Sequence, residues 1–242
     1  MMMTELAGGF REKKNPAVRP GVQQAVSRLR IRIWRTAEAA GISPREQLGL
    51  FREMAEKSGL SCALKSGNVK MSFGPAIAEG YESRAEYADL YINGFVGNAA
   101  ALAALGAVCP QGYSLMGVRR VPTQFPSVEE MLSAVSYTVE GGFFGTAEEL
   151  AAQTAACGVI TREKSDGRLA EFHPAELMLG VESGGPGAFR LLMTAGAGKN
   201  LRPELLLSRL AGRELVPGND LRIVREEFYW RNSDGQLVPV WD

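Results

Sequence analysis

The sequence predicts an α+β protein made of two tandem ferredoxin-like halves, each an antiparallel sheet with helices on one face. Two observations carry this prediction. Alternating strands and capped helices follow the order strand, helix, strand, strand, helix, strand over residues 28–122, and the same order returns over residues 134–232. A chain of 242 residues is long enough for two such units. We therefore expect two halves, each with one sheet face left open.

The elements of the first half follow from alternation and capping signals. Apolar and polar residues alternate over residues 29–34, which predicts a half-buried strand. Ser43, followed by Pro44 and Glu46, is typical of a helix start, and Gly59 ends that helix. The remaining elements are strands over 69–73 and 87–92, a helix that starts at Asn98, and a strand over 114–121.

The second half repeats these signals. Thr146 and Glu149 form a capping box, and the helix that they start runs to Gly158. We expect the segments 159–163 and 176–181 to pair as a hairpin. The other elements are strands over 135–139, 189–193 and 221–230 and a helix over 203–210.

The segments outside the two halves carry turn and charge signals. Residues 1–27 are predicted to be a flexible leader, because charges stand where a secretory signal needs an apolar run. Residues 123–133 are a linker, whose short helix is capped by Ser127 and Glu130. Residues 233–242 form a C-terminal tail that begins with a turn.

Composition restricts the possible functions. The 27 basic residues balance 27 acidic ones, so bulk charge does not require a nucleic-acid partner. No apolar run approaches the roughly 20 residues of a membrane span, and we expect a cytoplasmic protein. Cys62, Cys109 and Cys157 are too widely spaced for a disulfide framework or a zinc site. No metal and no cofactor are expected.

The open face of the first half is a candidate surface for RNA. If the apolar residues of the central strands face the helices, the alternate residues project from the open face. These residues are Arg30, Arg32, Trp34, Tyr87 and Tyr91. Arginines beside aromatic rings resemble the base-stacking platform of proteins that bind single-stranded RNA. Two alternatives remain: the second half packs across this face, or Arg32 and Asp89 form a cross-strand ion pair.

The chain carries no recognisable catalytic residue. His173 is the only histidine, and no partner for metal binding or nucleophilic catalysis can be identified from the sequence. The loop TAGAGKN at 194–200 lacks both the earlier glycine and the later serine or threonine of a phosphate-binding loop. The alternative is that Lys199 and Arg202 hold a phosphate at the start of the last helix.

Short motifs spread along the chain carry a family resemblance. They are Ser-Phe-Gly-Pro at 72–75, Gly-Tyr-Glu-Ser at 80–83, Glu-Tyr-Ala-Asp-Leu at 86–90, Leu-Arg-Pro-Glu-Leu-Leu at 201–206 and Arg-Ile-Val-Arg-Glu at 222–226. In this order they resemble the radical-SAM-linked protein family, a domain of unknown function. The matching residues singled out here are Ser72, Pro75, Glu82, Ser83, Glu86, Arg202, Pro203 and Arg225.

This resemblance implies a partner role. Members of that family occur beside, or fused to, a radical SAM protein with a cobalamin-binding type of domain, often near genes for ribosomal proteins and an RNase G-like ribonuclease. The resemblance thus implies a non-catalytic accessory or substrate-recognition protein in RNA modification or RNA metabolism. Many relatives carry Ser-His-Leu-Asp and Asn-Pro-His-Pro runs where this chain has residues 40–43 and 67–70, so both histidines are missing. The three-cysteine motif of radical SAM enzymes is also absent.

Two other functions remain open. The chain could be a nucleic-acid-modifying enzyme with chemistry near Glu82, Ser83 and Glu86, or a module whose open sheet face pairs with another protein. The doubled order is similar to that of tRNA pseudouridine synthases of the A type. In this chain, however, the Arg-Thr pair at 35–36 is followed by Ala37 and not by the aspartate nucleophile of those enzymes. Only the architecture would carry over.

Overall fold

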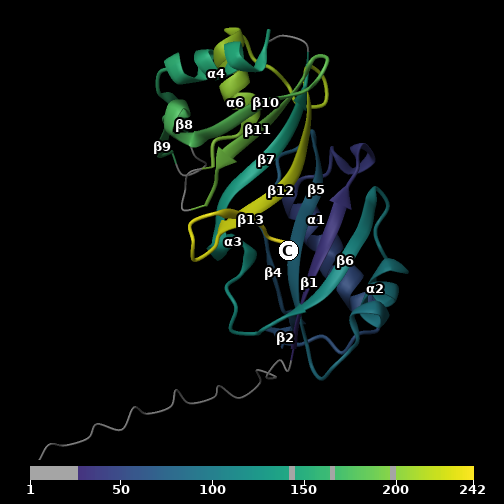
Figure 1. Ribbon diagram of the computed structural model, residues 1–242. Coiled ribbons are helices and arrows are strands. Elements are labelled where there is room, and N and C mark those ends of the chain that lie inside the picture. Colours follow the sequence, from purple (N-terminus) through teal and green to yellow (C-terminus); the bar gives the residue numbers. More distant parts are fainter. Residues whose placement is uncertain (1–26, 142–144, 164–166, 197–199) are drawn as a thin grey trace, which may run out of the picture.

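A single large sheet runs through the computed structural model, which describes residues 27–141, 145–163, 167–196 and 200–242. Its nine strands are β1 (Ser27–Arg35), β4 (Met71–Phe73), β5 (Tyr81–Ile92), β6 (Tyr113–Val121), β7 (Leu132–Glu140), β10 (Met178–Gly185), β11 (Ala188–Thr194), β12 (Arg222–Arg231) and β13 (Leu237–Pro239). Their order is β10-β11-β7-β12-β5-β1-β6, with β4 on β5 and β13 on β12 (Figure 1). The predicted α+β class, with a large and mostly antiparallel sheet, is confirmed.

The two halves of the chain meet at one pair of strands. The first half contributes the order β6-β1-β5-β4, and the second half contributes β12-β7-β11-β10. Between them β12 and β5 pair in parallel, with Ile223 opposite Tyr81 and Arg225 opposite Ser83. The sheet therefore continues from one half into the other, which the alternation patterns within each half did not indicate.

The helices are α1 (Pro44–Lys57), α2 (Asn98–Gly106), α3 (Val128–Met131), α4 (Ala147–Ala156), α5 (Pro174–Leu177) and α6 (Pro203–Ala211), with a 3-10 turn at Ala37–Ala39. Three of them begin at the predicted capping boxes of Ser43, Ser127 and Thr146, whereas the short helix α5 was not predicted. In α1, α3 and α4 the N-cap hydroxyl accepts a hydrogen bond from the backbone N–H of the glutamate three residues on, and that carboxylate accepts from the N-cap backbone N–H. Such boxes satisfy backbone donors that the first turn of a helix leaves free.

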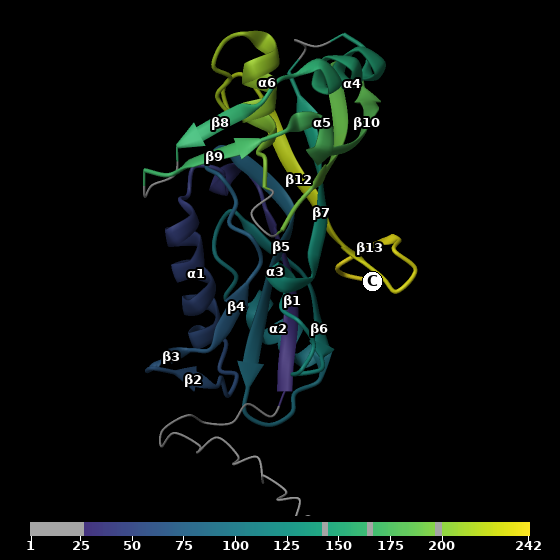
Figure 2. The same ribbon diagram turned by 90° about the vertical axis from the view of Figure 1, so that its left-hand side faces the viewer.

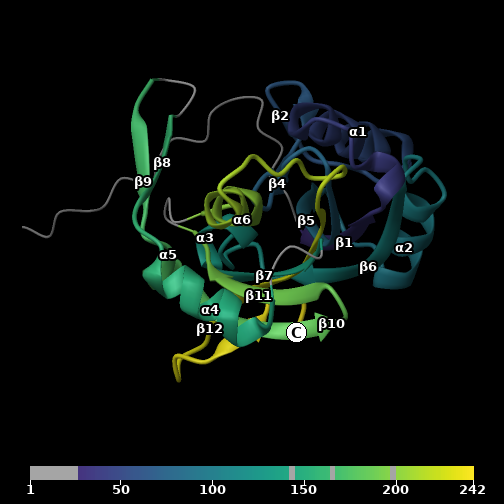
Figure 3. The same ribbon diagram turned by 90° about the horizontal axis from the view of Figure 1, so that it is seen from above.

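Two apolar clusters lie between the sheet and the helices. In the first half, Ile31 and Leu90 of the central strands pack with Phe51 of α1, and Figure 3 shows α1 and α2 beside β1 and β6. In the second half, Val139 of β7 packs with Leu206 of α6 in a separate cluster. Among the described residues, no helix is long and apolar enough to cross a membrane.

The predicted hairpin of the second half is wrong in its pairing. The segment β8 (Ile160–Glu163) pairs with β9 (Leu169–Phe172) as a hairpin of its own, which stands apart from the main sheet near α6 (Figure 2). Residues 176–181 instead form α5 and the start of β10, which pairs with β11. The turn that the sequence predicts for this hairpin is Ser165-Asp166-Gly167, and residues 164–166 lie outside the described residues. A second small hairpin joins β2 (Leu64–Lys65) to β3 (Asn68–Val69).

Candidate functional site

The face of the first half that lies opposite α1 and α2 brings together the residues that were predicted to bind RNA. Across β1 and β5, Arg30 lies opposite Asp89 and Arg32 lies opposite Tyr87. Tyr91 follows two residues further along β5, opposite Arg28. Because directly paired residues of neighbouring strands point to the same side, these side chains share one face, as the period of two predicts.

Cationic side chains lie over aromatic rings along this whole face. Measured to the ring centroids, the Lys70 ammonium is 4.1 Å and the Arg28 guanidinium 5.9 Å from Tyr91, Arg32 is 5.8 Å from Tyr87, Arg84 is 5.7 Å from Trp34, and Arg119 is 5.2 Å from Trp241. All are within the range in which a cation is attracted to a ring. We call these nine residues the cation–aromatic row.

Part of this face is covered, so the expected exposure of Arg30 is wrong. Arg30 is fully buried and donates two hydrogen bonds to Asp89, at 2.8 and 3.0 Å. It also donates to the Pro126 carbonyl of the linker at 3.3 Å. The linker therefore lies over Arg30, and a charge beneath it has to be paired because burial removes its water. Asp89 pairs with Arg30 and not with Arg32, whose guanidinium lies 2.9 Å from Glu227.

The C-terminal tail covers a second part, so the expected exposure of Tyr87 is also wrong. Trp241 stacks on Tyr87 with ring centroids 6.1 Å apart and an interplanar angle of 21°, and only 2% of Tyr87 is exposed. The Tyr87 hydroxyl donates to Glu227 at 2.7 Å. Burial, with the nearby Glu227 carboxylate, raises the pKa of Tyr87 well above its usual value. This face is thus covered by the linker and the tail, and not by the second half packing across it.

Three of the five predicted residues keep access to solvent. Arg32 has 25% of its side chain exposed, and Trp34 and Tyr91 are half-buried. Arg84, which contacts Trp34, has 53% of its side chain exposed and pairs with Glu226 at 3.1 Å. The accessible part of the cation–aromatic row is therefore its rim.

The family-motif residues meet at the seam between the halves. Arg225 is 3% exposed and donates to the Glu86 carboxylate, to the Pro75 carbonyl at 3.1 Å and to the Ser83 hydroxyl at 3.4 Å. Glu86 also accepts from the Gln47 amide of α1 at 2.6 Å. One guanidinium thus ties β12 to β5, to the Ser-Phe-Gly-Pro segment and, through Glu86, to a helix of the other half.

The remaining motif residues lie close to the same seam. Glu82 pairs with Arg222 at 2.6 Å across β5 and β12. Arg202 is the N-cap of α6 and lies 2.8 Å from Glu204. Ser72 and Pro75 line a cavity of about 370 Å³, and Pro203 is the first residue of α6. Lys199, which was expected as an alternative to hold a phosphate together with Arg202, lies outside the described residues.

A second arginine extends the buried network of the seam into the first half. Arg35 donates to Gln47 at 2.9 Å and to the carbonyls of Ala40 and Ile42. Burial lowers the pKa of Arg35, and burial raises the pKa of its neighbour Tyr113 to about 12. Arg35, the arginine of the Arg-Thr pair that resembles the pseudouridine synthases, thus holds the loop after β1.

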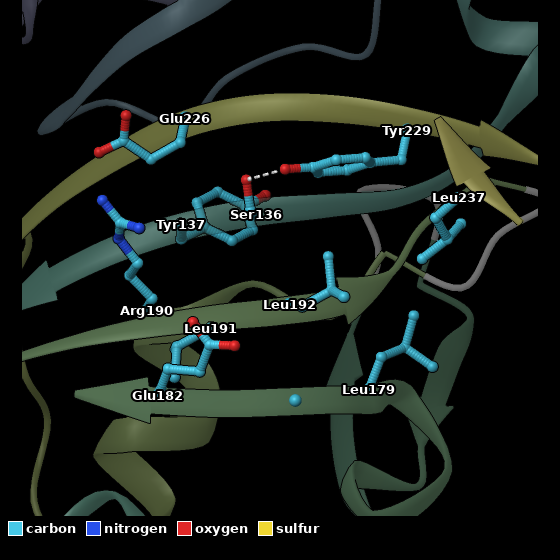
Figure 4. Close-up of a pocket in the computed structure, with 11 residues that line it drawn as sticks. Ser136, Tyr137, Leu179, Glu182, Arg190, Leu191, Leu192, Glu226, Tyr229 and Leu237 are labelled. Atoms are coloured by element: carbon cyan, nitrogen blue, oxygen red, sulfur yellow. Dashed lines mark hydrogen bonds between the residues drawn. The ribbon is translucent and has the colours of Figure 1, made fainter. Parts of the chain in front are cut away.

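The helix-free face of the second half carries a groove of about 580 Å³ (Figure 4). Leu179, Leu192 and Leu237 form its apolar side, and Leu179 is 42% exposed. Arg190 and Glu226 lie at the other end, as Figure 4 shows. A weak hydrogen bond of 3.4 Å joins the Ser136 and Tyr229 hydroxyls between the two ends.

The groups that could support metal or nucleophilic chemistry are dispersed. Within the described residues, no cluster of three or more His, Cys, Asp or Glu could hold a metal ion. The three cysteines are free and half-buried, and burial raises the pKa of the Cys62 and Cys109 thiols. His173 is exposed at the start of α5. Ser83 and Glu86, proposed as enzyme residues, are both buried against Arg225.

Sequence reasoning missed several contributors to these sites. Gly117 and Arg119 stand two residues apart on β6, opposite Arg32 and Arg30, so alternation on the fourth strand would have placed them on the same face. Trp241 had no such signal, because it follows a turn and a short strand in the tail. Gln47 lies within the α1 pattern, where a polar residue on the buried side was the available signal.

Comparisons with solved structures found remote similarities. One is a Cbf5–Nop10–Gar1 complex, with a TM-score of 0.39, 9% identity, and coverage of 81% of this chain and 48% of that chain. Another is an H/ACA RNP bound to a substrate RNA containing 2'-deoxyuridine, with a TM-score of 0.37, 10% identity, and coverage of 80% and 46%. A third is an archaeal box H/ACA sRNP Nop10–Cbf5 complex, with a TM-score of 0.35, 9% identity and the same coverage.

The chain spans about half the length of these solved chains. No curated protein matches it. A family model described as "uncharacterized protein conserved in bacteria (DUF2344)" matches residues 28–203, which include most of the motif residues at the seam. Because this match covers well over half of the 242 residues, the chain belongs to the DUF2344 family.

Proposed function

We propose that this protein is a non-catalytic accessory or substrate-recognition partner of a radical SAM enzyme in RNA modification or RNA metabolism. In this proposal the enzyme supplies the chemistry, and RNA binds to the accessible rim of the cation–aromatic row. Arg32, Trp34 and Tyr91 are the residues that RNA reaches directly, while Arg30 and Tyr87 support them from below. The radical SAM partner is supported by the motif resemblance, most of which falls within the matched family region.

The observation that carries the RNA proposal is the alternation of cations and rings along one sheet face. Every nucleobase has a π-face, so an exposed ring can stack on bases without reading their sequence. Beside the rings stand Arg28, Arg30, Arg32, Lys70, Arg84 and Arg119, against Asp89, Glu226, Glu227 and Asp242. Of these cations, Arg32, Lys70, Arg84 and Arg119 keep access to solvent, which supports contacts to phosphates although the whole chain is neutral.

We also propose that each half is a ferredoxin-like unit. The strand orders β6-β1-β5-β4 and β12-β7-β11-β10 support this, because in each the first and third strands of the half are central. In such a unit the helices occupy one face, which leaves the other for a partner.

The RNA proposal is tested by titrating a fluorescent single-stranded oligoribonucleotide with the protein, alone and with the enzyme encoded beside it. Trp34→Ala should weaken binding at every salt concentration, since one stacked base is worth roughly 1–3 kcal/mol. Arg32→Ala should also flatten the dependence of affinity on salt, because the variant has one cation fewer to release counterions from the RNA phosphates. Arg190→Ala, an equal loss of charge on the helix-free face of the second half, is the control. If RNA affinity in the complex is unchanged by Trp34→Ala and Arg32→Ala together, this face does not bind RNA.

The partner proposal is tested by pull-down from the native cell. The radical SAM protein should be enriched with this chain, and recovery of the chain without any such enzyme would contradict the proposal.

The protein-interaction module stays as a second candidate, because the groove of the second half exposes apolar surface. Leu179, at 42%, has the largest exposed fraction of the three leucines in the groove. Loss of enzyme capture in a Leu179→Ser variant that still binds RNA would support this role for the groove.

A further inference from the structure

The indole ring of Trp241 occupies a closely packed site on the face of the first half. It stacks on the Tyr87 ring, with 21° between the planes, and the Arg119 guanidinium lies 5.2 Å from its centroid. Tyr87 is in turn held by the hydrogen bond to Glu227 and by the nearby Arg32. The site is therefore a slot for one flat aromatic ring, with a ring on one wall and a cation beside it.

The backbone of β6 is shaped to admit this ring. A Cβ atom at Gly117 would come within 2.5 Å of the indole carbon Cζ2 of Trp241. Gly117 lies in the middle of a strand, opposite Arg32, where a glycine weakens the sheet and marks a close approach. Glycine at this position serves the slot, since any other residue would close it.

The ring can leave the slot without disturbing the rest of the tail. Val240 is 1% exposed, and its backbone N–H donates to the Phe228 carbonyl at 2.8 Å. β13 pairs with β12 just before it. Trp241 follows these anchors and is only half-buried. The backbone N–H of the next residue, Asp242, donates to the Pro239 carbonyl at 3.2 Å, so the main chain is held on both sides of the ring. A rotation of the Trp241 side chain alone would empty the slot.

The polar groups around the slot suit a nucleotide. Arg119 now donates to the backbone carbonyls of Val240 and Asp242, at 2.6 and 2.8 Å. Burial and the neighbouring Arg30 lower the pKa of Arg119, so an anion near it would be favourable. A phosphate beside a stacked base would offer such an anion, and Arg32 stands on the other side of Tyr87.

We propose that this slot is a nucleobase-stacking subsite, and that Trp241 occupies it until an unpaired base of RNA displaces the indole. The inference rests on the proposed function, because it concerns RNA bound on the same face. The tail would thereby lower the affinity of the free protein for RNA, and the subsite would take any base, since stacking does not read base edges.

The test compares wild-type protein with Trp241→Ala in a titration of a single-stranded oligoribonucleotide of about ten nucleotides that carries 2-aminopurine. The variant should bind the RNA about tenfold more tightly, because one base can then stack on Tyr87 without displacing the indole. It should also quench 2-aminopurine more strongly. Removing the stacking wall as well, in Trp241→Ala/Tyr87→Leu, should abolish the gain. Thermal unfolding of each variant checks that the sheet is intact, and Tyr229→Ala on the second half is the control for loss of an aromatic.

The outcomes separate this inference from the proposed function. Equal and measurable RNA affinity of wild type and Trp241→Ala would overturn the inference and leave the proposed function standing. Weaker binding by Trp241→Ala would also overturn it, because Trp241 would then be part of the RNA platform. A gain that persists in the double variant would show that Tyr87 is not the wall of the subsite. No RNA binding by either protein, even with the partner enzyme, would remove the proposed function and the inference with it.

Discussion

The two halves of this protein share a strand order, but the sheet face opposite the main helices is covered in the first half and bare in the second. In the first half, Arg30 of β1 lies opposite Asp89 of β5, and both are at most 1% exposed. In the second half, Thr138 of β7 lies opposite Arg190 of β11, and Arg190 is exposed. Strands with the same role in each half thus carry a buried ion pair in one case and a solvated cation in the other.

The difference lies in what covers each face. The linker and the C-terminal tail lie on the first half, and Pro126 and Trp241 are their main contacts. The second half has a groove with exposed Leu179 in the corresponding place. Covered charges must find partners because water is excluded, whereas a bare face can keep an unpaired cation and some apolar surface.

The largest expected effect tests the covered face. Asp89→Ala would leave Arg30 and Arg28 buried without their carboxylate, and we expect a loss of about 3–5 kcal/mol in the free energy of unfolding. Arg190→Ala, on the bare face, should change it by less than about 0.5 kcal/mol. Urea denaturation of both variants measures the difference. Equal losses would mean that the two faces are covered alike in solution.

A second large effect concerns the seam that joins the halves. Arg225→Ala removes the only arginine of β12 that is buried, and with it the partner of Glu86. We expect a loss of about 3–5 kcal/mol, since a buried carboxylate is left unpaired. Arg222 also bridges β12 to β5 but is half exposed, and it pairs with Glu82 and Glu140.

The control variant for the seam is therefore Arg222→Ala, which removes the same charge from the same strand. It should cost about 0–1 kcal/mol, because exposed ion pairs contribute little. Measured unfolding with two transitions for Arg225→Ala and one for Arg222→Ala would show that Arg225 couples the halves. A loss of less than about 1 kcal/mol for Arg225→Ala would contradict this role.

The elements of each half were predictable because their signals are local. The capping boxes at Ser43 and Thr146 and the alternation around Ile31 depend on neighbours within a few residues. The start of β5 was not predicted, since residues 81–83 pair with β12, which lies about 140 residues away in sequence. Pairing over such a distance leaves no periodic trace in either segment.

Alternation in the sequence predicted which side of the sheet the candidate residues occupy, but not how much of each side chain is exposed. Alternation placed Arg30, Tyr87 and Tyr91 on one side of the sheet, as the register has them. It could not reveal that the linker and Trp241 would lie on that side, because no local pattern in the tail shows which face of the sheet it packs on. The seam was visible only as motifs, and its buried ion pair joins Glu86 to Arg225 of the other half.

A smaller effect compares the halves at alkaline pH. Burial raises the pKa of Tyr113 in the first half and of Tyr137 in the second half to about 12. A tyrosine of the unfolded chain loses its proton near a pH of about 10. Between about pH 10 and about pH 12 the unfolded state therefore holds fewer protons than the folded state, and stability falls as the pH rises. This contribution is fully present below about pH 10.

Two phenylalanine variants measure that contribution through urea midpoints across this pH range. Tyr137→Phe should make the fall less steep with little change at neutral pH. Tyr113→Phe should do the same but also cost about 1 kcal/mol at neutral pH, because its hydroxyl bonds Gln47 at 3.2 Å. If neither variant changes the slope, these hydroxyls titrate normally and are not held in a buried environment.

The smallest expected effect tests whether the second face is bare in the free protein. Leu179 lies on the edge strand β10 at the rim of the groove, and its side chain is 42% exposed. Leu179→Ser should change the free energy of unfolding by no more than about 0.5 kcal/mol, as for surface sites. Leu169→Ser, on the separate β8–β9 hairpin with 66% exposure, is the matched control. A loss above about 1 kcal/mol for Leu179→Ser alone would mean that the groove is covered in solution. Unchanged stability, with capture of the radical SAM partner lost for Leu179→Ser and kept for Leu169→Ser, would instead mean that the partner covers the second half as the linker and tail cover the first.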